Sequence, residues 1–230
     1  MSQVERVQGA ITKFWDTVAT HYESHGGNTA PLDSDSYRRW VAVFQQYMPF
    51  PPADVLDTCC GTGFAALICS GLGHRVTGVD LAPNMLAIAR QLATERGLGA
   101  QFVEGDAVNP PFDHESFDAV VSRHSLWTLR SANEALRRWH QLLRPGGRVV
   151  LIDAFHSWDT SVSCAEEDDF FGQHYTSEVR ASLPFMKLQS ESPLMAAFTE
   201  ANFGRLEFQL LDRELSPDLS FQEYALIAYR

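Results

Sequence analysis

Apolar residues in the first part of the chain recur at three- and four-residue steps. This spacing places them on one face of a helix, and the first stretch predicts a helix over residues 4–24. A glycine pair at 26–27 ends that helix, and Asp33 or Ser34 can cap a second one. The two apolar faces consist of Val4, Val7, Ile11, Phe14, Val18 and Tyr22, then Tyr37, Trp40 or Val41, Phe44 and Tyr47.

Between residues 54 and 153 the pattern changes to short apolar runs that alternate with amphipathic stretches. Runs such as residues 119–121 are continuously apolar, as in a strand buried on both faces of a parallel sheet. The alternation predicts an α/β fold with a right-handed, doubly wound parallel sheet. Residues 206–214 and 221–229 predict two further strands that pair as a hairpin. We therefore expect a Rossmann-like sheet of seven strands, parallel except for an antiparallel strand in the C-terminal hairpin.

The stretch Val55-Leu56-Asp57-Thr58-Cys59-Cys60-Gly61-Thr62-Gly63 predicts a strand, a tight loop and a helix start. Gly61 and Gly63 permit backbone angles and close approaches that a side chain would block, so the loop can lie directly against a ligand. Asp57 stands at the end of this strand, and Asp80 follows the next strand. An ionised carboxylate offers only acceptors and suits two neighbouring ribose hydroxyls. The spacing therefore favours a nucleoside-containing ligand.

This pattern resembles the class I S-adenosylmethionine-dependent methyltransferases, whose first motif runs Val-Leu-Asp-x-Gly-x-Gly-x-Gly. The chain departs from it at Cys59, where the family usually has its first glycine, and a side chain there narrows the floor under the cofactor. The resemblance spans almost the whole chain and implies S-adenosylmethionine as cofactor. It also implies that Asp106 takes the adenine amino group and that Tyr22 reaches the methionine end. The expected cofactor-binding residues are Tyr22, Asp57, Thr58, Cys59, Gly61, Gly63, Asp80, Leu81, Met85, Asp106, Ala107 and Arg123.

The chain is long enough for one α/β domain with additions, and 45% hydrophobic residues suffice for a full core. We expect a single methyltransferase domain over residues 1–230. In the family that the chain resembles, N-terminal helices fold over the cofactor, so residues 1–53 are expected to form a helical lid. Residues 54–153 are the expected cofactor-binding core, 154–203 an insertion that caps the substrate, and 204–230 the terminal hairpin.

The segment Arg-His-x-Leu-Trp-Thr-Leu after the fourth strand resembles a branch related to quinone and small-metabolite methyltransferases. The implied function is methyl transfer to an O, N or C atom of a small, aromatic or heteroaromatic metabolite. Such a transfer needs positioning above all, and a base only where the acceptor loses a proton. His124 is the best placed candidate base because it follows strand four, His156 comes next, and His174 is a third. Each can instead hydrogen-bond backbone groups or form pocket wall.

Aromatic side chains gather near the fourth strand's end and in the insertion after the fifth. They suit a pocket for a flat or apolar small molecule, although ordinary core packing is the alternative. An acidic run at 166–169 can attract a cationic acceptor, but acids at a helix N-terminus are commoner. The expected substrate-binding residues are Trp127, His156, Trp158, Phe171, Tyr175 and Phe185.

The formal net charge of −11 disfavours a surface that follows nucleic-acid phosphates. The N-terminus lacks the pattern of a secretory signal, and no apolar run approaches the roughly 20 residues of a membrane helix, so we expect a cytoplasmic protein without a membrane partner. The four cysteines lack the paired spacing of a zinc site, and we expect no metal. The sequence leaves a homodimer open.

Two other functions fit parts of the pattern. Gly61-Thr62-Gly63-Phe64-Ala65-Ala66 also matches Gly-x-Gly-x-x-Ala of nicotinamide-dependent oxidoreductases, with Asp80 at a plausible distance downstream. The acid at Asp57, the long helical start and the terminal hairpin count against that reading. The departure at Cys59 motivates the second alternative, a cofactor-binding subunit without catalysis. Titration with each cofactor, together with an assay of methyl transfer, would separate the three functions.

Overall fold

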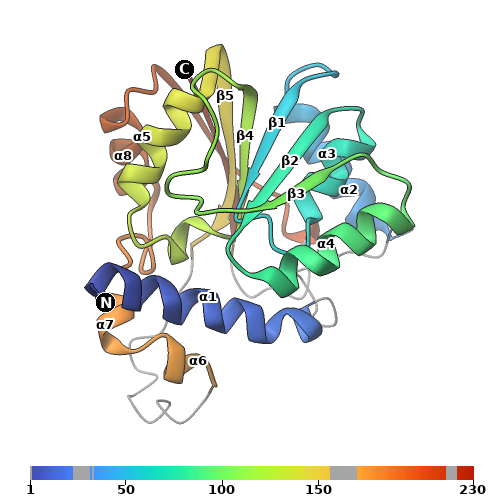
Figure 1. The fold of residues 1–230 in the computed structure, drawn as a ribbon. Coiled ribbons are helices and arrows are strands. Elements are labelled where there is room, and N and C mark those ends of the chain that lie inside the picture. Colours follow the sequence, from blue (N-terminus) through green and yellow to red (C-terminus); the bar gives the residue numbers. More distant parts are fainter. Residues whose placement is uncertain (1, 23–31, 33, 156–169, 216–221) are drawn as a thin grey trace.

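The computed structural model describes residues 2–22, 32, 34–155, 170–215 and 222–230. Its centre is a seven-stranded sheet of order β3-β2-β1-β4-β5-β7-β6 (Figure 1). Strands β1 to β5 pair in parallel, whereas β7 is antiparallel to both β5 and β6. The predicted fold class, including its terminal hairpin, is confirmed. The strands are β1 Asp54–Thr58, β2 Arg75–Asp80, β3 Gln101–Glu104, β4 Phe117–Arg123, β5 Leu143–Ala154, β6 Arg205–Leu210 and β7 Glu223–Tyr229.

Helices cover both faces of the sheet, as the alternation of strands and helices requires. Leu56 and Leu151 pack on the side of α5 and α8, whereas Val55 and Ile152 pack on the side of α2, α3 and α4. Successive residues of β1 therefore enter two separate cores. The helices are α1 Gln3–Tyr22, α2 Asp35–Tyr47, α3 Phe64–Gly71, α4 Pro83–Glu95, α5 Ala132–Leu142, α6 Phe170–His174, α7 Ser177–Ala181 and α8 Glu191–Glu200, with short 3-10 turns at Leu126–Thr128 and Arg213–Leu215.

The two N-terminal helices occupy different places. The Ser34 side chain accepts a hydrogen bond from the Tyr37 backbone N–H and so caps α2, as the sequence predicts. Trp40 and Phe44 of α2 are buried against α3 and the sheet. Helix α2 thus extends one face of the core, whereas α1 lies over the carboxyl ends of the strands.

Helix α1 crosses the edge of the sheet at which the parallel strands end (Figure 1). It contacts α4 on one side and the short helices α6 and α7 on the other. Val7 and Ile11 are buried in a cluster of their own with Trp127 and Tyr175, separate from the two sheet cores. Side chains of α1 therefore attach it to α4, α6 and α7, and the helix is not part of the two cores that cover the sheet.

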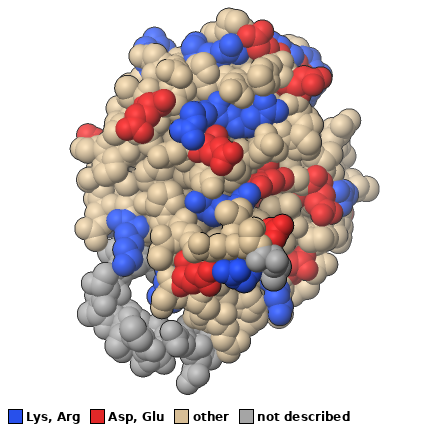
Figure 2. Space-filling view, turned by 60° about the vertical axis from the view of Figure 1, so that its left-hand side comes forward, with Lys and Arg blue, Asp and Glu red and all other residues tan. Residues whose placement is uncertain are grey.

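The molecule's charges are mixed on the face that Figure 2 shows, where acidic and basic side chains are interspersed. None of the described helices is both long and apolar enough to cross a membrane.

Candidate active site

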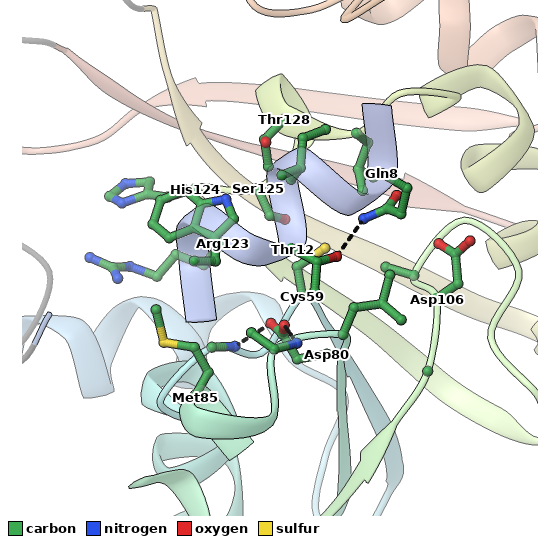
Figure 3. Close-up of a pocket in the computed structure, with 18 of the residues that line it drawn as sticks. Gln8, Thr12, Cys59, Asp80, Met85, Asp106, Arg123, His124, Ser125 and Thr128 are labelled. Atoms are coloured by element: carbon green, nitrogen blue, oxygen red, sulfur yellow. Dashed lines mark hydrogen bonds between the residues drawn. The ribbon is translucent and has the colours of Figure 1, made fainter. Parts of the chain in front are cut away.

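A pocket lies at the carboxyl ends of β1, β2 and β4, beneath α1 (Figure 3). Ligands of open parallel sheets bind at this edge because the loops that leave the strands converge there. The cavity measures about 80 Å³. Helix α1 contributes Gln8, Ile11, Thr12, Trp15 and Tyr22 to its lining; the loops after β1, β2 and β3 contribute Cys59, Gly61, Asp80, Leu81, Ala82, Met85, Gly105, Asp106 and Ala107; and Arg123, His124, Ser125, Thr128 and Leu129 complete it.

The loop after β1 has left-handed backbone angles at three positions. The φ values are +51° at Cys59, +52° at Gly61 and +88° at Gly63, where α3 begins. A Cβ at Gly63 would lie 3.0 Å from the Phe102 ring, so glycine is required there. Cys59 adopts the conformation that a glycine favours while keeping a side chain, at a cost of roughly 1–2 kcal/mol. Burial raises the pKa of its thiol, which is therefore neutral at physiological pH.

Asp57 supports this loop from behind the pocket wall. Its side chain is 2% exposed and accepts a hydrogen bond of 2.9 Å from the Ala66 backbone N–H in the first turn of α3. Burial is the main reason that the pKa of Asp57 is raised to about 7, and the nearby Asp80 adds to the rise. Thr58 is also buried, and its hydroxyl donates to the Val121 carbonyl oxygen at 3.1 Å. Asp57 and Thr58, like Gly63, shape the loop without lining the cavity.

Asp80 lines the cavity and ties two loops together. One carboxylate oxygen accepts from the Gly61 backbone N–H at 2.9 Å, and the other accepts from the Ala82 backbone N–H at 2.9 Å (Figure 3). A carboxylate oxygen can accept more than one hydrogen bond, so these contacts leave capacity for two ligand hydroxyls. Burial raises the pKa of Asp80, while the backbone hydrogen bonds oppose that rise.

Asp106 also lines the cavity, and it takes part in an ion pair that the sequence does not reveal. Arg130 Nη2 lies 2.5 Å from Asp106 Oδ2, and the Val108 backbone N–H donates to Oδ1 at 2.9 Å. The same guanidinium donates through Nη1 to the Gln8 side-chain oxygen on α1. Arg130 therefore links the covering helix to the acid expected at the adenine end. Asp16 strengthens the cover at the other end of α1, because it accepts from the Asn84 backbone N–H at 2.8 Å.

His124 also lines the cavity, and its ring is held by a residue from β7. Its Nε2 lies 2.7 Å from Oε1 of Glu223, and both side chains are largely buried. Burial and the adjacent Arg123 lower the pKa of His124, whereas Glu223 acts in the opposite direction. The Arg123 guanidinium itself lies over the rings of Trp40 and Phe64, 4.5 and 4.3 Å from their centroids.

Three residues expected to bind the substrate, Trp127, Phe171 and Tyr175, pack beneath α1. Trp127 and Tyr175 are buried beneath this helix, and Phe171 stacks on Tyr175 with ring centroids 4.4 Å apart. Trp15 Nε1–H donates to the Tyr175 hydroxyl at 3.0 Å, and that hydroxyl is also hydrogen-bonded to Thr128. Trp127, Phe171 and Tyr175 pack against one another and are not among the residues that line the cavity, whereas Trp15 is.

The remaining predicted residues lie elsewhere. Phe185 is part of the core on the α5 face of the sheet. His174 is half-buried at the end of α6, where its Nδ1 is hydrogen-bonded to the Phe170 carbonyl oxygen at 3.0 Å. His156 and Trp158 are outside the described residues. Within the described part of the chain, no group of three or more His, Cys, Asp or Glu residues is arranged to hold a metal ion.

The sheet order, the antiparallel β7 and the acid-bearing glycine loop define the fold of class I methyltransferases. Residues 56–151 match the family model described as a methyltransferase domain. This match covers the cofactor-binding core and, with the sheet order, identifies that core as a class I methyltransferase domain; it counts against the alternative of a nicotinamide-dependent oxidoreductase.

Among known proteins, the chain is 40% identical over 104 residues to a demethylmenaquinone methyltransferase of Thermus thermophilus, covering 44% of this chain and 47% of the relative. It is 37% identical over 156 residues to a demethylmenaquinone methyltransferase of Lactococcus lactis, covering 66% of this chain and 60% of the relative. The chain thus spans about half the length of such curated relatives.

Solved structures with the same fold differ in activity. A phosphoethanolamine N-methyltransferase of Haemonchus contortus, solved with S-adenosylhomocysteine, superposes with a TM-score of 0.70 at 18% identity, covering 96% of this chain and 60% of that chain. The [4+2]-cyclase SpnF superposes with a TM-score of 0.66 at 18% identity, covering 96% and 95%. The fold alone therefore does not fix the reaction, which has to be argued from the site.

Proposed function

We propose that this chain transfers the methyl group of S-adenosylmethionine to a small aromatic acceptor of the hydroxylated-naphthalene (quinol) class. The observation that carries the proposal is the pocket itself. Asp80 and Asp106 line one cavity at the carboxyl ends of the strands, together with the aromatic residues Trp15 and Tyr22 of α1. The names of the relatives, which are demethylmenaquinone methyltransferases, support a quinone-derived acceptor.

The residues present fit the cofactor. Asp80 has the acceptor capacity for two ribose hydroxyls, and Gly61 leaves room above the loop because it has no side chain. Asp106 and Ala107 lie where the adenine end would be held, and Met85 adds an apolar contact. The cofactor supplies an electrophilic methyl group whose bond to a positively charged sulfur breaks with both electrons left on the sulfur.

The protein's part in the reaction is positioning and exclusion of water. A methyl acceptor has to be held about 3 Å from the methyl carbon and in line with the bond that breaks. Ile11, Trp15 and Leu129 give the cavity apolar walls, and apolar walls exclude water that would compete as acceptor. A quinol acceptor loses one proton, whether oxygen or ring carbon is methylated, so a base is needed, and His124 is the candidate at the cavity wall.

We expect α1 to move when the ligands enter. The cavity of about 80 Å³ is far smaller than the roughly 300–1,000 Å³ of ordinary ligand pockets. Helix α1 closes it and is attached through side chains, chiefly Gln8, Asp16 and Trp15, and not through the sheet. Exchange of such contacts is a usual way for an active-site cover to open. We expect the open form to admit both ligands and the closed form to resemble the structure described.

The proposed function is tested with a panel of acceptors and methyl-labelled S-adenosylmethionine. The panel contains reduced naphthoquinones without the ring methyl group, simple phenols, catechols and small amines. We expect label in the naphthoquinols and none in the amines. Label transferred only to amines would overturn the acceptor class. Cofactor binding in calorimetry without transfer to any member would favour a non-catalytic subunit instead.

A further inference from the structure

Glu223 lies at the active-site edge although it begins its strand, because that strand is antiparallel to its neighbours. Strand β7 runs antiparallel to β5, and Glu223, its first residue, pairs with Ala154 at the carboxyl end of β5. The beginning of β7 therefore lies beside the ends of the parallel strands. Its side chain is 4% exposed, which is unusual for a glutamate unless the carboxylate has a partner.

That partner is His124. The distance of 2.7 Å from His124 Nε2 to Glu223 Oε1 is that of a charge-assisted hydrogen bond. The histidine backbone is fixed as well, because its N–H donates to the Ile152 carbonyl oxygen at 2.9 Å and its carbonyl oxygen accepts from Trp127 Nε1 at 3.0 Å. His124 has a φ of +51°, a backbone conformation that non-glycine residues seldom adopt. This conformation sets the direction of its side chain. Such a conformation persists only where the surroundings hold it.

Charged groups from three strands surround the imidazole. Glu223 on β7 and Asp153 on β5 favour its protonated form, whereas Arg123 on β4 and burial disfavour it. Asp153 is itself buried and accepts from the backbone N–H groups of Leu126 and Ala154 at 3.2 and 2.9 Å. The two carboxylates thus compensate Arg123, and Glu223 is the one in direct contact with the ring.

We propose that Glu223 is the positioning residue that makes His124 a general base for the acceptor. This inference rests on the proposed function. The carboxylate accepts from Nε2–H and so fixes the tautomer, and the acceptor's proton is then taken at Nδ1. With an oxygen acceptor the O–H pair would form the new bond to the methyl carbon; with a ring carbon the π electrons would form it and the C–H pair would return to the ring. In both cases the methyl–sulfur bond would break with its electron pair left on sulfur, and the imidazole would hold the proton. The negative charge of Glu223 stabilises the resulting imidazolium.

The first test compares Glu223→Gln with wild type and with Glu207→Gln, an exposed glutamate of β6 in the same sheet. Glutamine keeps the side-chain shape and removes the charge. We expect kcat for a naphthoquinol to fall about 100-fold or more, the scale of a general base, with cofactor affinity within twofold. The acidic limb of the pH profile should move to lower pH, because removing Glu223's charge lowers the pKa of His124. Wild-type kcat together with an unmoved limb would overturn the inference.

The second test does not depend on the acceptor. In protein labelled with ¹⁵N-histidine, long-range ¹H–¹⁵N spectra report which ring nitrogen of His124 carries the proton. We expect Nε2–H in wild type and in Glu223→Asp; a proton on Nδ1 would overturn the inference even if methyl transfer is observed. If Nε2–H is found but wild type methylates no acceptor, the proposed function fails while the Glu223 contact stands. Should Glu223→Gln not fold, Glu223→Asp carries both tests, with a smaller loss of kcat expected.

Discussion

Replacing Asp57 by Asn should change how the stability of the protein depends on pH. The carboxyl is buried and accepts from the Ala66 backbone N–H, and its pKa is raised to about 7, chiefly by burial. Asparagine keeps an oxygen that can accept the same hydrogen bond, but it cannot ionise. The substitution therefore removes the titration while leaving the support of the loop in place.

The magnitude follows from the difference between the two pKa values. The ordinary value for this carboxyl is 3.8. Between about pH 4 and pH 7 the unfolded chain has lost the proton while the folded protein still holds it, so the free energy of unfolding of wild type falls as pH rises. Each pKa unit corresponds to about 1.4 kcal/mol, so the total loss reaches up to about 4 kcal/mol and is complete above about pH 7.

The assay is urea unfolding of wild type and Asp57→Asn at several values between about pH 5 and pH 8. We expect the variant to gain stability over wild type as pH rises and the gain to level off above about pH 7. Asp113→Asn, at an exposed position, serves as the matched control and should follow wild type throughout. A difference between Asp57→Asn and wild type that stays constant over the whole pH series would refute the reasoning.

Three further predictions concern the cofactor loop and its cover. Asp80→Ala should weaken S-adenosylmethionine binding by about 1–3 kcal/mol in calorimetry, because two ribose hydroxyls lose their acceptor; unchanged affinity in a folded variant would remove Asp80 from the ribose. Arg130→Met should speed amide hydrogen exchange in α1 by releasing Gln8, and equal exchange rates would show that this contact does not hold the helix. Cys59→Gly should change the free energy of unfolding by less than about 1 kcal/mol. Glycine relieves the strain of the left-handed backbone angle but loses more conformational entropy on folding, and cofactor affinity should be equal or tighter. A tenfold loss of affinity there would show that the thiol is a required part of the floor.

The sequence predicts the acids of the site because of a simple rule of parallel sheets. Asp80 and Asp106 follow consecutive strands, and the ends of parallel strands meet at one edge. The rule says which edge a residue reaches but not whether its side chain faces the cavity. Asp57 obeys the rule yet points behind the wall, where it holds the first turn of α3. Asp57 therefore supports the loop through this hydrogen bond and does not line the cavity.

Residues that the sequence does not reveal depend on contacts between distant parts of the chain. Glu223 is 99 positions from His124 and begins a strand that runs against the others, so no local spacing joins the two. Its one local signal is an acid at the start of an apolar strand. Trp127 and Tyr175 illustrate the opposite case. An aromatic-rich segment predicts burial, but whether a ligand or α1 covers the rings is decided by tertiary packing.

The central claim is that the pocket beneath α1 performs methyl transfer from S-adenosylmethionine, and single-turnover transfer measures it most directly. Enzyme is loaded with methyl-labelled cofactor and mixed with a reduced naphthoquinone that lacks its ring methyl group, and the acceptor is analysed by mass spectrometry. Wild type is expected to yield one labelled methyl group per acceptor, and Asp80→Ala far less at the same cofactor concentration. Equal yields from both proteins, or no labelled product from wild type that demonstrably holds the cofactor, would contradict the central claim.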